Sequence, residues 1–153
     1  MDTVLEHLYI SRELLSSLLH PIRMKYQLTP AEMLVLLFLA NQHEGDTAKD
    51  IVEAMRITKS HVSVSVRHLQ ERGYLQGDYK GCDHRSIHLQ LCDAAADVIA
   101  DAQKAQKQLL SILEQGFSQE ELDTFSAYLR RATGNIHTYL KESAAANAGV
   151  APQ

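Results

Sequence analysis

Residues 57–73, ITKSHVSVSVRHLQERG, decide the fold because they contain a run that fits two kinds of secondary structure. From His61 to Val66, polar and β-branched residues alternate, which is the pattern of a half-buried strand. The flanks favour a helix instead. Thr58 is a good N-cap, Gly73 is typical of the position just after a helix, and the 14 residues between them have the length of a helix. We therefore predict a helix from about residue 59 to 72.

The two sides of this predicted helix differ. At about 100° per residue, Val62, Val66 and Leu69 form one apolar stripe, which we expect to face a core. The opposite side carries Ser60, Ser63, Val64 and Arg67. An ordinary solvated face favours Glu, Lys and Gln, which are better helix formers than Ser and Val. We interpret this side as a surface that approaches DNA closely; the alternative is an ordinary exposed face with weak helix propensity.

Each group on that side suits a contact with a double helix. Ser hydroxyls can meet phosphates or base edges, Val64 can pack on a thymine methyl, and Arg67 can reach guanine or phosphate. Lys59, Ser60 and His61 lie at the predicted N-terminus, where backbone N–H groups also attract phosphate. We therefore predict DNA contacts along the whole side.

The composition narrows the class of protein. The 153 residues are 45% apolar and 22% charged, which is ordinary for a globular protein. No apolar run approaches the roughly 18 residues of a membrane span, and no secretory signal pattern is visible, so we expect a cytoplasmic protein. The sequence has no Gly-rich phosphate loop, nucleophile elbow or paired acids on one face, so we expect neither an enzyme nor a cofactor. Two cysteines, Cys82 and Cys92, are too few for a disulfide framework and form no zinc-binding spacing.

The charge is unevenly distributed. The net charge of −4 argues superficially against a nucleic-acid partner, because phosphate binding needs local positive charge. Residues 56–90 nevertheless hold six basic and three acidic residues, together with four of the eight histidines. Positive charge is therefore gathered in the segment that contains the predicted DNA-contacting helix, and the flanking segments are acidic.

A capping box precedes this segment and marks a second helix. Thr29 is the expected N-cap, Pro30 occupies the first helical position, and Glu32 completes the box. The residues that follow, MLVLLFLA, are apolar on nearly all sides. Such a helix is buried on most of its surface, so we expect it at the centre of the domain.

Two more helices are predicted around it. Apolar residues recur at helical spacing from Leu5 to Ile22, with Pro21 kinking or ending that first helix. A short helix is predicted from about Thr47 to Met55, after the break at residues 43–46. The short helix and the 59–72 helix, joined tightly, have the order of a helix-turn-helix.

A β-hairpin and two long helices complete the chain. Residues 74–80 and 86–91 are predicted strands, with Ile87, Leu89 and Leu91 alternating strictly. Helices are then predicted from 93 to about 115 and from about 118 to 142, separated by Gly116. The fold class is thus mainly α with a small β-hairpin wing. We predict a winged helix-turn-helix lobe over 28–92, helical dimerisation regions over 1–27 and 93–143, and a disordered tail over 144–153.

The sequence resembles the MarR family of bacterial transcriptional regulators. The resemblance rests on LTPAEMLVLLFLA, on TAKDIVEAMRITKSHVSVSVRHLQERGYL, and on Asp83-His84-Arg85-Ser86 in the wing, where the family commonly shows an Asp-x-Arg pattern. It covers about residues 5 to 142. It implies a sequence-specific DNA-binding regulator, a ligand-responsive repressor that binds a pseudo-palindromic operator as a homodimer.

The resemblance also assigns roles to residues. It makes the predicted 59–72 helix the recognition helix, the helix that enters the major groove of DNA. It places Ser60, Ser63, Val64 and Arg67 on the groove-facing side of that helix. Arg85 would reach into a minor groove from the wing tip beside His84, and Asp83 would orient it; an Arg there suits the negative potential of a narrow minor groove. The sequence departs from the family's pattern at Val64, where relatives often have a basic residue, and at Cys92, where they often have Thr.

The helical flanks are the expected dimer interface. Their apolar stripes are too extensive to be buried on a small winged helix, and family members pair these segments between two subunits. The candidates for core and interface are Leu109, Leu110, Leu113, Phe117, Leu122, Phe125, Leu129, Ile136 and Leu140. A two-fold dimer presents its recognition helices to half-sites about one helical turn apart.

The signal that controls such a regulator is open on sequence grounds. Tyr9, His20, Tyr26 and Met33 are candidates for a ligand cleft, although ordinary packing also accounts for each. Cys82, on a predicted turn near basic residues, is a candidate redox switch. The histidines form no HxxxH or HExxH pair, so we expect no metal. A winged-helix module that binds proteins instead of DNA remains the alternative to the regulator.

Overall fold

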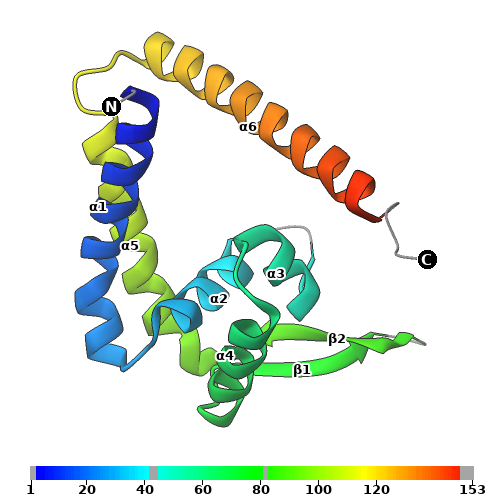
Figure 1. The fold of residues 1–153 in the computed structure, drawn as a ribbon. Helices are drawn as coiled ribbons and strands as arrows, with labels where there is room; N and C mark the ends of the chain where they lie inside the picture. Colours follow the sequence, from blue (N-terminus) through cyan, green and yellow to red (C-terminus); the bar gives the residue numbers. More distant parts are fainter. Residues whose placement is uncertain (1–2, 42–44, 81–82, 149–153) are drawn as a thin grey trace. The chain divides into compact units, whose positions relative to one another are not determined.

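The computed structural model describes residues 3–41, 45–80 and 83–148, and the side chains of 6–41, 45–79 and 86–143. The predicted fold class is confirmed, because the described part of the chain consists of helices and a single two-stranded antiparallel hairpin (Figure 1). The elements are α1 (Thr3–Tyr26), α2 (Pro30–Ala40), α3 (Ala48–Met55), α4 (Lys59–Glu71), β1 (Leu75–Lys80), β2 (Asp83–Leu91), the short 3-10 helix η1 (Asp93–Ala95), α5 (Ala96–Leu113) and α6 (Gln119–Ala148).

Helix α1 runs past the proline that was predicted to kink or end it. Pro21 lies inside the helix, which continues to Tyr26. A proline removes one backbone hydrogen bond, but the helix gains packing beyond it, because Ile22 and Tyr26 both contact the core. The chain then turns at Gln27, whose φ of 51° is in the left-handed region, and the N–H of Leu28 donates to the carbonyl of Arg23 at 2.8 Å.

Helix α2 is the central helix, as predicted. Its capping box forms in full: the N–H of Glu32 donates to the Thr29 hydroxyl at 3.2 Å, and the N–H of Thr29 donates to the Glu32 carboxylate at 2.7 Å. Apolar side chains on several sides of the helix, such as Met33, Val35 and Phe38, are buried. The helix therefore supplies the middle of the hydrophobic core.

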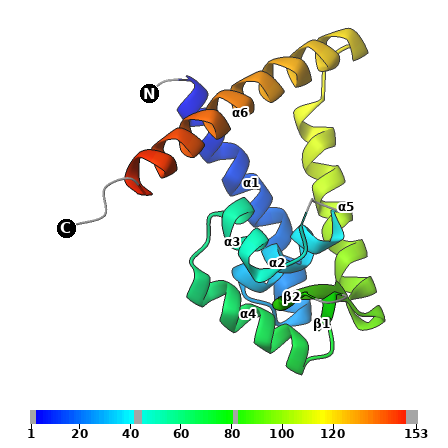
Figure 2. The same cartoon turned by 90° about the vertical axis from the view of Figure 1, so that its right-hand side faces the viewer.

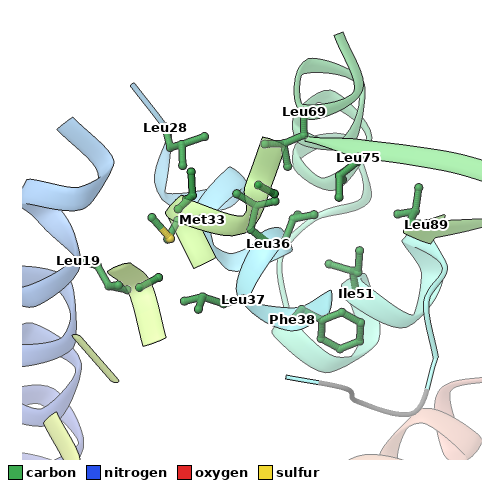
Figure 3. Packing of buried hydrophobic residues seen from close by; sticks show 14 of the residues in the cluster. Leu19, Leu28, Met33, Leu36, Leu37, Phe38, Ile51, Leu69, Leu75 and Leu89 are labelled. Carbon is green, nitrogen blue, oxygen red and sulfur yellow. The ribbon is translucent and has the colours of Figure 1, made fainter. Parts of the chain in front are cut away.

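The core joins α2 to every other element of the first 110 residues. Figure 3 shows Leu36, Leu37 and Phe38 of α2 among side chains from α1, α3, α4 and both strands. Its buried members outside α2 are Leu19, Leu28, Ile51, Val62, Leu69, Leu75, Leu89, Ala95, Val98, Ala102 and Ala105. Burial of this kind contributes roughly 1.5–3 kcal/mol to the stability of the fold for each large aliphatic side chain. Because these residues form one continuous core, the helix-turn-helix is fixed to α1 and α5.

The hairpin follows α4 directly, as predicted. Strands β1 and β2 are antiparallel, with Leu75 opposite Leu91 and Gly77 opposite Leu89. Leu75 and Leu89 are buried on the core side. The N–H of Leu89 also donates to the carbonyl of Asp46 at 2.8 Å, and His88 forms an isolated bridge with Thr47. The loop before α3 thus anchors the base of the wing.

The chain divides into two compact units, residues 1–110 and 111–153. This differs from the predicted boundaries at 28 and 92, because Leu19 of α1 and Val98, Ala102 and Ala105 of α5 share the core of the helix-turn-helix. In the second unit, Gly116 has a φ of 87° in the turn that follows the end of α5 at Leu113, and Ser118 caps α6 through Glu121.

Helix α6 is longer than predicted. It extends to Ala148, whereas the sequence suggested an end near Glu142 and a disordered tail from 144. The helix thus includes 144–148 of the segment predicted as a tail, where the alanine-rich sequence has high helix propensity even without large apolar residues; residues 149–153 lie outside the described part. Among the described residues, no helix combines the length and apolar character that crossing a bilayer requires.

Candidate nucleic-acid interface

Helix α4 is held at both ends by the residues that its sequence predicted. The Thr58 hydroxyl accepts a hydrogen bond from the N–H of His61 at 3.4 Å. At the other end Gly73 has a φ of 71°, the N–H of Tyr74 donates to the Leu69 carbonyl at 2.8 Å, and the N–H of Gly73 donates to the Gln70 carbonyl at 2.9 Å. These two bonds form a Schellman motif, which fixes where the helix ends.

The faces of α4 agree with the predicted placement. Val62 and Leu69 are buried and Val66 packs against the core. The predicted DNA-contacting residues of this helix are all exposed: Lys59, Ser60, His61, Ser63, Val64 and Arg67. Figure 2 shows α4 along one edge of the first unit, with α2 and α3 on one side of it. The alternating run therefore forms a helix that presents short polar side chains outward.

The charge on this surface is less than the sequence count suggests. Arg67 Nε lies 4.0 Å from a carboxylate oxygen of Glu71, one turn along the same helix. Arg72 is bound elsewhere: its guanidinium donates to the main-chain carbonyls of Tyr26 and Gln27 at 2.6 and 2.9 Å. Arg67 and Lys59 are therefore the cations that α4 offers to a partner.

The wing is described only in part. Asp83, His84 and Arg85 begin β2, but their side chains lie outside the described residues, as does the whole of Cys82. The base of the hairpin is held by His88, whose Nδ1 contacts the carboxylate of Asp46. Asp46 lies in a loop 42 residues earlier in the sequence, and its contact with His88 fixes β2, the strand that contains Arg85.

A groove beside α4 was not predicted. It has a volume of about 550 Å³ and is lined by Arg12, Thr29, Pro30, Ala31, Glu32, Leu34, Ile57, His61, Val64, Ser65 and His68. The α4 residues in this set recur at helical spacing, which was a signal available in the sequence. Val64, 43% exposed, lies both on the outer side of α4 and at this groove. A molecule in the groove would therefore contact α4 directly.

The four residues predicted for a ligand cleft do not lie together. Tyr9 and His20 line an open hollow on α1, whereas Met33, which is buried, lines a separate hollow between α1 and α2. The hydroxyl of Tyr26 donates to Asp101 of α5 at 3.0 Å. Within the described residues, no group of three or more His, Cys, Asp or Glu side chains is arranged to hold a metal ion.

The comparison with known sequences matches the helix-turn-helix segment. A sequence model described as the MarR family matches residues 26–81, from the end of α1 to the end of β1. No curated protein sequence matches the chain.

Solved structures match most of the chain. A MarR family transcriptional regulator from Silicibacter pomeroyi is 19% identical, with a TM-score of 0.77 over 88% of this chain and 90% of that one. MepR from S. aureus, solved as a DNA complex, is 19% identical, with a TM-score of 0.69 over 88% of this chain and 98% of that one.

A third structure, a Listeria monocytogenes protein assigned to the same family and solved with 26mer DNA, is 15% identical, with a TM-score of 0.75 over 93% of this chain and 95% of that one. At these identities the likeness establishes the fold. The match over residues 26–81 and the shared fold confirm the resemblance drawn from the sequence: the helix-turn-helix segment matches the sequence model of the MarR family, and the chain has the fold of that family's transcriptional regulators.

Proposed function

We propose that the protein is a sequence-specific DNA-binding transcriptional repressor that acts as a homodimer and responds to a small-molecule effector. The observation that carries the proposal is the exposed side of α4, where Ser60, Ser63, Val64 and Arg67 lie together while Val62 and Leu69 are buried. Short side chains let this helix enter a major groove, and the fold is one in which relatives were solved with DNA.

The contacts that we propose fall into two sets. Ser60, Ser63, Val64 and Arg67 would meet base edges and phosphates from α4, with Lys59 and His61 at its N-terminal end. Asp83, His84 and Arg85 would act at the wing, where Arg85 would enter a minor groove. The first set reads sequence, and the second adds affinity beside it.

The proposal of a homodimer rests on exposed apolar side chains in the second unit and at the start of α1. Helix α6 has large apolar side chains with 41–68% of their surface exposed, among them Phe125, Leu129 and Tyr139. Leu8 and Ile10 of α1 are also exposed. Apolar surface of this extent marks an interaction site, and a two-fold symmetric partner would place two recognition helices on one operator. Sedimentation equilibrium checks this, because a monomer at micromolar concentration would contradict it.

The effector is proposed to bind in the groove beside α4. Arg12, His61 and His68 supply polar or cationic groups there, and Pro30, Leu34 and Ile57 supply apolar ones. A ligand held between α1, α2 and α4 would stabilise a position of α4 that differs from the one that fits DNA, and would thereby weaken DNA binding. Aromatic acids suit such a lining, and an effector is identified by release of bound DNA. An oxidant that released DNA would instead favour regulation through Cys82.

The test is a binding titration with the DNA that flanks the protein's own gene, followed by fluorescence anisotropy. We expect specific binding that weakens steeply between low and moderate salt, as phosphate contacts require. Arg67→Ala and Arg85→Ala should each weaken binding, whereas Lys107→Ala, an exposed lysine on α5, is the matched control. Absence of salt-dependent binding, or equal binding by all variants, would favour a winged-helix module that binds proteins.

A further inference from the structure

Arg72 lies at the end of the recognition helix but its guanidinium faces another helix. It is the C-cap of α4. Its Nη2 donates to the carbonyl of Tyr26 at 2.6 Å and its Nη1 donates to the carbonyl of Gln27 at 2.9 Å. Tyr26 and Gln27 stand at the C-terminal end of α1, where backbone carbonyls lack partners within the helix. A cation at this end is also favoured by the helix dipole.

The guanidinium is itself held in place. It lies 4.8 Å from the centroid of the Tyr74 ring, and its Nη2 is 3.3 Å from the Tyr74 hydroxyl. The backbone of both residues is fixed by the Schellman motif that ends α4, and Leu69, whose carbonyl takes part in that motif, is completely buried. Arg72 is therefore a rigid extension of α4 and not a freely moving surface side chain.

The contact continues into α5. The Tyr26 hydroxyl donates to Asp101 Oδ2 at 3.0 Å, and Lys25 Nζ lies 2.8 Å from the same oxygen. The end of α1 thus holds α4 through its main-chain carbonyls and α5 through two neighbouring side chains. All of these residues lie in the first compact unit.

We propose that Arg72 is a positioning residue for DNA recognition: it fixes the orientation of α4 relative to the α1–α5 framework and thereby the separation of the two recognition helices. This rests on the proposed function, in which α1 and α5 belong to the dimerisation region. Half-sites lie about one helical turn apart, so a small rotation of α4 on each subunit moves both reading surfaces out of register with the operator.

The chemistry requires arginine. Two nitrogens of one planar fork bind two successive carbonyls, which fixes an angle as well as a distance, whereas a lysine ammonium is a point charge on a flexible stem. A residue that only supplied positive charge would be replaced well by lysine. A residue that sets an orientation would not.

The test uses the full-length protein with Arg72→Lys and Arg72→Ala, and Lys107→Ala as the control. Affinity is measured on the operator, on operators with the half-site spacing changed by one or two base pairs, and on unrelated DNA. We expect both Arg72 variants to bind the operator about tenfold more weakly, to bind unrelated DNA as wild type does, and to lose most of the preference for one spacing. The salt dependence should stay unchanged, because Arg72 is already bound to protein carbonyls.

Other results would overturn the inference. If Arg72→Lys binds the operator as tightly as wild type does, the residue acts only through its charge. If the slope of the logarithm of affinity against the logarithm of salt concentration falls by about one, as on loss of one phosphate contact, Arg72 touches DNA directly. An equal loss on all DNA that tracks a lower melting temperature would mean a merely structural role. If wild-type protein binds no DNA, the proposed function fails and this inference with it, whereas wild-type binding that both variants match would overturn the inference alone.

Discussion

The carboxylate of Glu32 in α2 lies 3.4 Å from Nδ1 of His68 in α4. Glu32 is buried, and its other oxygen accepts the backbone N–H of Thr29 at 2.7 Å. One carboxylate therefore completes the capping box of the central helix and also contacts the recognition helix. The capping box was evident in the sequence, but the contact to His68 depends on how α2 and α4 pack.

Replacement of Glu32 tests this double role. Glu32→Ala should lower the free energy of unfolding by about 1–3 kcal/mol, because it removes a helix cap and a charged hydrogen-bond partner. His68→Ala should cost less than about 1 kcal/mol, since the His68 side chain is 46% exposed. Urea denaturation measures both changes. A larger loss for His68→Ala than for Glu32→Ala would contradict the assignment.

Gly77 and Gly134 allow the same replacement, glycine to alanine, to be compared at a crowded position and at an open one. A Cβ at Gly77 would lie 2.6 Å from Cγ2 of Ile87 on the opposite strand, whereas nothing lies within 4 Å of a Cβ at Gly134 in α6. Gly77→Ala should destabilise the protein by about 1–3 kcal/mol through overpacking of the hairpin. Gly134→Ala should stabilise it by about 0.5–1 kcal/mol, because alanine favours a helix interior. Thermal unfolding of both variants decides the point, and equal effects would refute it.

The contact between α1 and α5 should respond to acid. Hydrogen bonds from Lys25 and then Tyr26 lower the pKa of Asp101 to about 2. A carboxyl whose pKa is lowered by folding stabilises the native state above its ordinary pKa of about 3.9 and loses that contribution as the pH falls towards its folded value. Asp101→Asn should therefore be less stable than wild type at pH 5, and the difference should shrink between pH 4 and pH 2. Denaturant unfolding across this range would show a constant difference if the account were wrong.

Val64 offers a test of base contact at a single methyl group. If Val64 packs on a thymine, replacing that thymine by uracil should weaken wild-type binding about fourfold, the value of one buried methyl of about 0.8 kcal/mol. Val64→Ala should show little response to the same replacement. Competition titrations with each substituted operator measure the coupling. If no thymine position responds in wild type, Val64 serves the groove beside α4 and does not read a base.

Local sequence signals predicted most of the fold. Thr58 and Gly73 set the ends of α4, Thr29 and Glu32 set the start of α2, and the helical placement of Val62 gave the buried face. These features depend on neighbours within a few residues, so they can be derived from the chain itself.

Contacts between distant segments could not be predicted in this way. Arg72 reaches the carbonyl of Gln27 across 45 residues, and His88 contacts Asp46 across 42. Both pairings depend on how the helices pack around α2, and no local pattern encodes that. The passage of α1 through Pro21 has the same origin, since tertiary packing outweighs one lost hydrogen bond.

The measurement that tests the central claim most directly is chemical footprinting of the protein on the DNA beside its own gene. We predict two protected major-groove segments related by two-fold symmetry, with centres about 10 base pairs or a multiple of one helical turn apart. Arg67→Ala should weaken protection of both segments together, and Lys107→Ala should leave them unchanged. Protection that is absent, unsymmetrical or insensitive to Arg67→Ala would contradict the account.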